Sequence, residues 1–153
     1  MSRIIRLFIM SLMFRSMSVL AAGCVVDTSS GLNFGQYDVF DFVATDSESI
    51  VTVTCDLLSP PLISVELGAS SVSGSILQRQ MQHSSSASRL DYNLFIDAAR
   101  TLVWGDYSAG APLTLLNIND GNPRQLRVYG RIPPGQNASV GSYSDNVMVT
   151  ILP

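Results

Sequence analysis

Few side chains in this sequence could do covalent or acid–base chemistry. Its single histidine, His83, lies in the polar stretch Gln82-His-Ser-Ser-Ser86. A Ser/His/Asp catalytic site needs a fixed shell that orients the imidazole, and a serine-rich loop is poor at supplying one. No glycine loop of the phosphate-binding type is present. We therefore expect His83 to be solvated and the protein to be non-catalytic, with no cofactor.

The two cysteines, Cys24 and Cys55, are the remaining reactive side chains. One histidine and two cysteines cannot complete a four-ligand shell, so we expect no metal site. In an exported protein an even pair of cysteines indicates a disulfide, which would stabilise the fold by roughly 3–4 kcal/mol on the chain-entropy model. Two alternatives stay open: a pair of buried thiols, and lipidation of Cys24, because Ala21-Ala-Gly-Cys24 approaches a lipoprotein box.

Residues 1–23 are typical of a cleaved export signal. Arg3 and Arg6 form a basic start, Leu7 to Phe14 an apolar stretch, and Val19 to Gly23 a small-residue cleavage region. We expect this segment to be removed and residues 24–153 to form one domain.

The mature chain predicted in this way is acidic. Loss of three of the nine basic residues leaves six arginines, no lysine and twelve carboxylates, a net charge of −6. An acidic surface without lysine argues against nucleic acid and anionic membrane as partners.

Short apolar runs between Gly, Pro and Asn turns predict an all-β domain of seven or so strands, best fitted by an immunoglobulin-like sandwich. Clean alternation predicts a strand at Ser49–Cys55, and we expect further strands at Leu62–Leu67, Leu113–Ile118 and Gln125–Ile132. Gly31–Tyr37 resembles a short strand and turn. The serine-rich stretch from Gly68 to Arg89 is weakly patterned, so we expect a long, mobile connection there.

The segment Leu90–Trp104 has two interpretations. Leu90, Leu94, Ala98 and Leu102 recur at helical spacing. The alternation through Tyr92 and the β-branched and aromatic residues instead favour strand–turn–strand, which we prefer.

The last predicted strand shows the strongest pattern. Tyr143, Asp145, Val147, Val149 and Ile151 share one parity, as in a half-buried strand. A strand of this kind in an antiparallel sandwich is normally followed by a turn and a return strand, and none follows it here. We therefore expect an incomplete sandwich that lacks its final strand.

Several strings occur in a characteristic order. They are Leu32-Asn-Phe-Gly-Gln-Tyr37, Val51-Thr-Val-Thr-Cys55, Leu90-Asp-Tyr-Asn-Leu94, Asp97-Ala-Ala-Arg100, Val103-Trp-Gly-Asp106, Val128-Tyr-Gly-Arg-Ile-Pro133 with Gln136, and Gly141-Ser-Tyr-Ser-Asp145 running into Val147 and Val149. This ordered set resembles the spore coat protein U-like domain, the family that includes subunits of archaic chaperone–usher pili such as Csu pili. The resemblance covers about residues 24–152.

The resemblance implies a non-catalytic pilus or surface subunit assembled by donor-strand complementation. Its partners would be a periplasmic pilus chaperone, which first lends a strand, an outer-membrane usher, and a neighbouring subunit whose N-terminal extension replaces the chaperone strand. Such a protein is exported through the periplasm to the cell surface or a pilus, or is secreted. The cysteine pair of the family matches Cys24 and Cys55, which favours the disulfide over lipidation.

Five residues are our candidates for the walls of the acceptor groove. We expect Val147, Val149 and Ile151 to form one wall, and Leu32 and Phe34 to form the opposite one. Ordinary core packing is the alternative for all five.

Three aromatic residues also match the family motifs, and we expect packing roles for them: Tyr92, Trp104 and Tyr129.

One departure from the family pattern bears on position in a fibre. Fibre-forming members carry an alternating apolar donor segment before the first cysteine, whereas Cys24 lies almost at the predicted cleavage site. We therefore expect a terminal or tip subunit. The alternatives are an adhesive binding module, which would recognise a surface or glycan through the serine-rich or Tyr107 loops, and a stand-alone secreted coat-like protein.

Overall fold

The structure is a computed structural model that describes residues 23–28, 31–56, 62–118 and 120–152. The predicted export signal lies outside the described residues except for Gly23. No helix in these ranges is long and apolar enough to cross a membrane.

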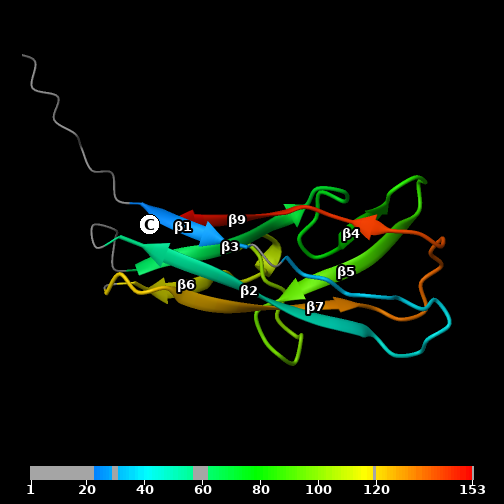
Figure 1. Cartoon of the computed structure of the whole chain (residues 1–153), viewed down its shortest axis with the longest axis horizontal. Coiled ribbons are helices and arrows are strands. Elements are labelled where there is room, and N and C mark those ends of the chain that lie inside the picture. Colours follow the sequence, from blue (N-terminus) through cyan, green and yellow to red (C-terminus); the bar gives the residue numbers. More distant parts are fainter. Residues whose placement is uncertain (1–22, 29–30, 57–61, 119, 153) are drawn as a thin grey trace, which may run out of the picture.

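Within these ranges the chain forms nine strands and one short 3₁₀ turn (Figure 1). The elements are β1 Cys24–Asp27, β2 Thr45–Cys55, β3 Leu62–Ser70, β4 Arg79–His83, β5 Arg89–Phe95, η1 Ser108–Gly110, β6 Thr114–Asn117, β7 Arg124–Ile132, β8 Tyr143–Ser144 and β9 Val147–Leu152.

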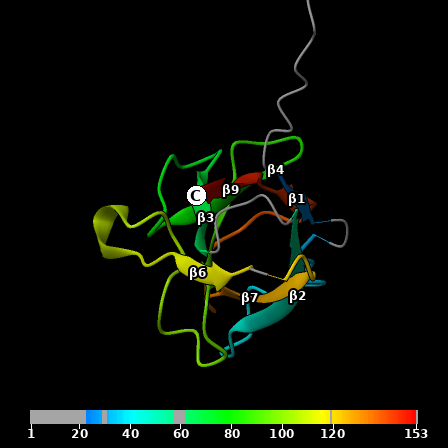
Figure 2. The same cartoon turned by 90° about the vertical axis from the view of Figure 1, so that its left-hand side faces the viewer.

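The strands build two antiparallel sheets that curl around one core (Figure 2). One sheet has the order β1-β2-β7-β5-β4-β8 and the other has the order β6-β3-β9. The predicted all-β, immunoglobulin-like sandwich is therefore confirmed.

Alternating side chains of the central strands supply the core. On β2, Val51, Val53 and Cys55 are buried and their neighbours are not. On β3, Ile63 and Val65 are likewise buried at alternate positions. The indole Nε1 of Trp104 donates to the carbonyl of Val65 at 3.0 Å. Buried apolar side chains on alternate positions bring the inner faces of the two sheets together.

The strands expected at Ser49–Cys55, Leu62–Leu67, Leu113–Ile118 and Gln125–Ile132 are confirmed, since β2, β3, β6 and β7 lie at these positions. Strand–turn–strand is also correct for Leu90–Trp104, because β5 is followed by a turn and by a single bridge between Phe95 and Val103.

The strand predicted at Gly31–Tyr37 is wrong. Gly31 and Gly35 have positive φ angles of 52° and 73°, which take the backbone out of the extended conformation. The side chain of Asn33 also accepts from the N–H of Gly35 at 2.9 Å, forming a local turn. The first strand of the described chain is instead β1, which lies earlier and was not predicted.

The mobile connection predicted from Gly68 to Arg89 is also wrong, because β3 continues to Ser70 and β4 follows. The inward residues of β4 are Arg79, Met81 and His83, all buried. Two of these three are polar, so the strand has no apolar alternation to reveal it.

The C-terminal stretch is not one strand. Tyr143 and Ser144 form β8, which pairs with β4 in the larger sheet, whereas β9 pairs with β3 in the smaller one. The chain changes sheets at Asp145 and Asn146. The parity shared by Tyr143 and Val147 therefore does not place them on one continuous face.

Candidate functional site: a groove between β1 and β9

Two edge strands flank an opening in the sandwich. In the described part of the chain, the larger sheet begins at β1, which pairs with β2, and the smaller sheet ends at β9, which pairs with β3. Figure 1 shows β1 and β9 side by side, and Figure 2 shows them at adjacent corners of the curled fold. The main chain of an edge strand is available for pairing with a further strand.

A groove of about 550 Å³ lies between these edges. One wall includes Val26, Leu32 and Phe34, and the other includes Val147 and Val149. The floor is mostly apolar and is formed by Val51, Leu67, Met81, Tyr92, Leu94 and Val128. The structure thus brings four of the five predicted wall residues together along one cavity.

Ile151, the fifth predicted wall residue, packs half-buried against the core cluster and is absent from the groove lining. It pairs with Val65 on β3, near the C-terminal end of β9.

Leu32 and Phe34 hold their places because β7 has a glycine beneath them. A Cβ at Gly130 would lie 2.7 Å from the ring of Phe34 and 2.9 Å from the side chain of Leu32. The Phe34 ring also meets Tyr92 edge to face, with centroids 5.9 Å apart. The part of this wall formed by Leu32 and Phe34 is therefore held by side-chain packing, because the main-chain pairing of β1 with β2 ends before it.

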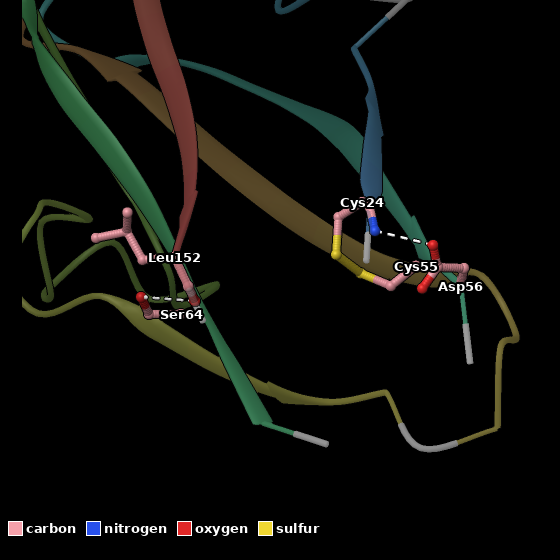
Figure 3. The surroundings of a disulfide bond; sticks show 6 residues. Cys24, Cys55, Asp56, Ser64 and Leu152 are labelled. Carbon is pink, nitrogen blue, oxygen red and sulfur yellow. Dashed lines mark hydrogen bonds between the residues drawn. A yellow bond between two sulfur atoms is a disulfide. The ribbon is translucent and has the colours of Figure 1, made fainter. Parts of the chain in front are cut away.

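A disulfide ties β1 to the sandwich. Cys24 and Cys55 are directly opposed on β1 and β2 and are joined by an S–S bond of 2.01 Å (Figure 3). The N–H of Gly23 donates to Asp56 Oδ2 at 2.9 Å, and the N–H of Asp56 returns a bond to the carbonyl of Gly23 at 3.0 Å. The predicted disulfide is confirmed. Because the Cys24 sulfur is bonded to Cys55, it is not available for lipidation.

Asp145 organises the end of the groove where the chain changes sheets. Its Oδ2 accepts from the hydroxyl of Tyr92 at 2.7 Å, and its Oδ1 accepts from the N–H and hydroxyl of Ser71 at 3.0 and 2.7 Å. Tyr92 lies on β5 in the larger sheet, whereas Ser71 follows β3 in the smaller one. One carboxylate therefore fixes the start of β9 against both sheets.

Burial raises the pKa of Tyr92, and its hydrogen bond to the Asp145 carboxylate raises that pKa further. The phenol stays protonated, so it remains the donor of this bond.

Arg79, which falls in the stretch expected to be a mobile connection, is a fully buried cation beside the groove floor. Its guanidinium donates to the carbonyl of Trp104 at 2.8 Å and to the Asn93 side-chain oxygen at 2.7 Å, besides carbonyls of β3. Burial lowers the pKa of Arg79, and Tyr92 and Asp145 act against that effect. Met81, which shares the inward face of β4 with Arg79, is the one apolar residue on that face, so the sequence pattern did not reveal this position.

His83 was expected to be solvated, but it is buried, with only 8% of it exposed. Its Nδ1 accepts from the N–H of Ser85 at 3.0 Å, which leaves Nε2 as the donor to the carbonyl of Val140, also at 3.0 Å. The ring packs edge to face on Tyr143, 5.0 Å away, and over Gly141. The Nε2 bond holds the 133–142 loop to β4, the ring packing holds β8, and the Nδ1 bond fixes the turn that follows β4.

Trp104 is 1% exposed in the core, and Tyr129 lies half-buried on β7 with the Arg100 guanidinium 5.6 Å from its ring centroid. Across the described ranges, no three His, Cys, Asp or Glu side chains gather in a way that could hold a metal ion.

Comparison with known proteins gives three findings. The model of the Spore Coat Protein U domain matches residues 10–150. Protein U of Myxococcus xanthus is 34% identical over 146 residues, which are 86% of this chain and 78% of that protein. In the CsuC–CsuE chaperone–tip adhesion subunit pre-assembly complex, from archaic chaperone–usher Csu pili of Acinetobacter baumannii, one chain has the same fold, with a TM-score of 0.60 and 18% identity. That match covers 85% of this chain and 39% of the other.

Proposed function

Because the chain belongs to the Spore Coat Protein U domain family, we propose that it is a non-catalytic structural subunit of a pilus or surface coat whose groove receives a β-strand from another polypeptide. The observation that carries this proposal is the pair of edges, β1 and β9, that flank an apolar groove. A strand laid between them would pair its main chain with an edge and place alternate side chains over the floor.

The size of the groove supports an assembly without covalent links. Four or five apolar side chains buried at roughly 1.5–3 kcal/mol each contribute about 6–15 kcal/mol before ordering costs are subtracted. We assign the first donor to a periplasmic chaperone and the final donor to a neighbouring subunit, delivered through an outer-membrane usher. The Acinetobacter complex, whose name includes a chaperone and a tip adhesion subunit, supports this choice of partners.

We further propose a terminal position in the fibre, which depends on cleavage of the chain after Gly23. A mature chain that starts at Cys24 accepts a strand and has none to donate, which places it at the end of a fibre that is assembled first. N-terminal sequencing of the exported protein tests this, because a start well upstream of Val19 would restore a donor.

The groove is tested by co-expression with a candidate pilus chaperone from the same genome. We expect a soluble one-to-one complex, and we expect Val149→Asp to abolish it by placing a charge in the groove. Met148→Asp is the matched control, because Met148 is the next residue on β9 and is 73% exposed.

A stable, cooperatively folding monomer without any partner would contradict the open groove. Equal complex yields for Val149→Asp and Met148→Asp would contradict its use.

A stand-alone coat-like protein is the second candidate, favoured by the extensive similarity to Protein U. Chaperone and usher genes beside the gene for this chain favour the pilus subunit, and their absence favours the coat protein.

A further inference from the structure

The groove between β1 and β9 differs in character along its length. Among the described residues that line it, Asp145 is the only one with a charged side chain. Its neighbours in the chain, Tyr143, Ser144 and Asn146, also line the groove and are polar, whereas the wall continues along β9 with valines. The groove is therefore acidic at the end where the chain changes sheets and mostly apolar beyond it.

The carboxylate of Asp145 is bonded only by neutral groups in the described part of the chain. Its Oδ1 accepts from the N–H of Asn146 at 2.8 Å, besides the two bonds from Ser71. Its Oδ2 accepts from the hydroxyl of Tyr92 alone, at 2.7 Å. No ion pair within the described ranges includes Asp145. A carboxylate oxygen can accept two hydrogen bonds, so Oδ2 keeps the capacity for one more.

Arg79 acts on Asp145 only through space. Its guanidinium donates to main-chain carbonyls and to the side chain of Asn93. Burial lowers the pKa of Arg79, and the charges of Tyr92 and Asp145 counteract that effect, so the two groups are within electrostatic range. Arg79 nevertheless lies buried beside the groove floor with its hydrogen bonds directed elsewhere, and it leaves Oδ2 without a cationic donor.

A strand that fills the groove removes water from this carboxylate. Burial of a charge without a bonded partner is costly, because the lost hydration is not replaced. A lysine or arginine of the donor would replace it with a charge-assisted bond to Oδ2. The apolar stem of such a side chain would meet the ring of Phe34, which lines the groove and packs on Tyr92. A glutamate or aspartate at the same place would be repelled.

We propose that Asp145 is a specificity-determining residue of the groove, which favours a donor strand with lysine or arginine at the inward position facing Asp145 and disfavours one with an acidic residue there. This inference rests on the proposed function and adds to it the chemistry of the donor. We assign the basic residue to the strand of the neighbouring subunit. The chaperone strand has to be replaced, and a bond made only by its successor makes that replacement favourable.

The test uses peptides with blocked termini, because blocked termini carry no charge. The parent peptide has about nine residues, at roughly 3.3 Å per residue, in which inward valines alternate with threonines. In its derivatives, either the first or the last valine is replaced by lysine, glutamine or glutamate. Each derivative competes with a fluorescent copy of the parent peptide for the groove of the full-length chain, and fluorescence anisotropy gives its dissociation constant.

The two termini of the peptide lie at opposite ends of the groove, so one substituted position faces Asp145 whichever way the strand runs. At that position we expect lysine to bind at least about tenfold more tightly than glutamate, with glutamine between them. At the other position the lysine and glutamate peptides should bind within about twofold of each other. This second position controls for the general attraction of a basic peptide to an acidic protein.

Two variants of the chain separate a role in specificity from a role in folding. Asp145→Asn removes the charge and keeps an oxygen acceptor for Tyr92, so the preference for lysine over glutamate should fall to about twofold or less. Glu66→Gln removes a carboxylate from the outward side of β3, which does not line the groove, and should keep the full preference. Circular dichroism verifies the fold of each variant, and the peptide series on the wild-type chain tests the proposal even where Asp145→Asn does not fold.

Equal binding of the lysine and glutamate peptides at both positions, or the same preference at both, would overturn the role of Asp145 and leave the groove in place. A full preference retained by Asp145→Asn would do the same. Failure of the parent peptide to bind would overturn the groove itself and, with it, this inference.

Co-expression with the candidate chaperone distinguishes the two donors. We expect equal complex yields for the wild type and Asp145→Asn, because the basic residue is assigned to the neighbouring subunit. A lower yield for a correctly folded Asp145→Asn would overturn that assignment in favour of the chaperone strand.

Discussion

The guanidinium of Arg79 on β4 donates twice to the main-chain carbonyl of Gly68 on β3, at 2.7 Å from Nη2 and 3.2 Å from Nε. Nη2 also donates to the carbonyl of Leu67 at 3.1 Å. These carbonyls lie where the pairing of β3 with β9 shifts register, between Leu67 and Ser70. Arg79 therefore supplies donors where the strand ladder is interrupted, and it joins the two sheets behind the groove.

Replacement of Arg79 by methionine should destabilise the protein strongly. It leaves several buried acceptors without a donor, at about 1–3 kcal/mol for each unpaired group, so we expect a loss of at least about 3 kcal/mol. Arg79→Lys should lose less stability than Arg79→Met, because lysine keeps a charged donor although it lacks the planar fork of the guanidinium. Urea unfolding of the donor-bound protein, followed by the fluorescence of the single tryptophan, measures both. Exposed Arg89 is the control, and an equal effect of Arg89→Met would contradict the role of Arg79.

Removal of the disulfide should loosen the β1 wall of the groove. In the described residues β1 pairs with β2 alone, and the bridge closes a separation of 31 residues. Cys24→Ser/Cys55→Ser should lose about 3–4 kcal/mol of stability and bind a donor peptide more weakly. Titration with the peptide under oxidising conditions measures the second effect. Unchanged peptide affinity would mean that β1 keeps its place without the bridge.

A methyl group at Gly130 should disturb the opposite end of the same wall. Gly130→Ala would place a Cβ within 3 Å of Leu32 and Phe34, and displacement of these side chains should cost about 1–3 kcal/mol and weaken donor binding. Gly68→Ala is the matched control, since its new Cβ would meet Met148 at ordinary contact distances of 3.5 Å and above. Titration calorimetry with a donor-strand peptide measures the affinity of each variant. Equal affinities of Gly130→Ala and Gly68→Ala for the peptide would contradict this account of the wall.

The Tyr92–Asp145 bond should make stability fall at alkaline pH. The pKa of Tyr92 is raised by burial above its ordinary value of 10.0, so the neutral phenol is favoured in the folded state. The corresponding stability is complete below about pH 10 and is lost as the pH rises above it. Tyr92→Phe should lose about 1.5–3 kcal/mol near neutral pH, the usual range for a bond to a charged group, and should show a shallower alkaline decline.

Urea unfolding between pH 8 and 11 checks this prediction, with Tyr107→Phe as the control because Tyr107 is 74% exposed. Parallel alkaline declines for the wild type and Tyr92→Phe would contradict it.

Much of the fold could be predicted from local patterns in the sequence. Strands with apolar alternation, such as β2 and β7, were found because one face of each is buried, and burial selects residues at every second position. The pairing of Cys24 with Cys55 was predictable because the sequence holds one pair of cysteines and the family resemblance matches it.

The polar parts of the site could not be found in this way. Arg79 and His83 point inward on β4, and no sequence rule distinguishes a polar side chain with buried partners from a solvated one. Their partners, including Gly68 and Val140, lie far along the chain or on another sheet.

The amino-acid sequence by itself determined the all-β class, the central strands and the apolar character of Leu32, Phe34, Val147 and Val149, because these depend on residue type and short-range spacing. Only the tertiary structure decided that β8 and β9 belong to different sheets, because the bonds that divide them join Asp145 to Ser71 and Tyr92 across the fold. It likewise decided that β1 and β9 face each other as edges, since strand order depends on contacts between distant segments.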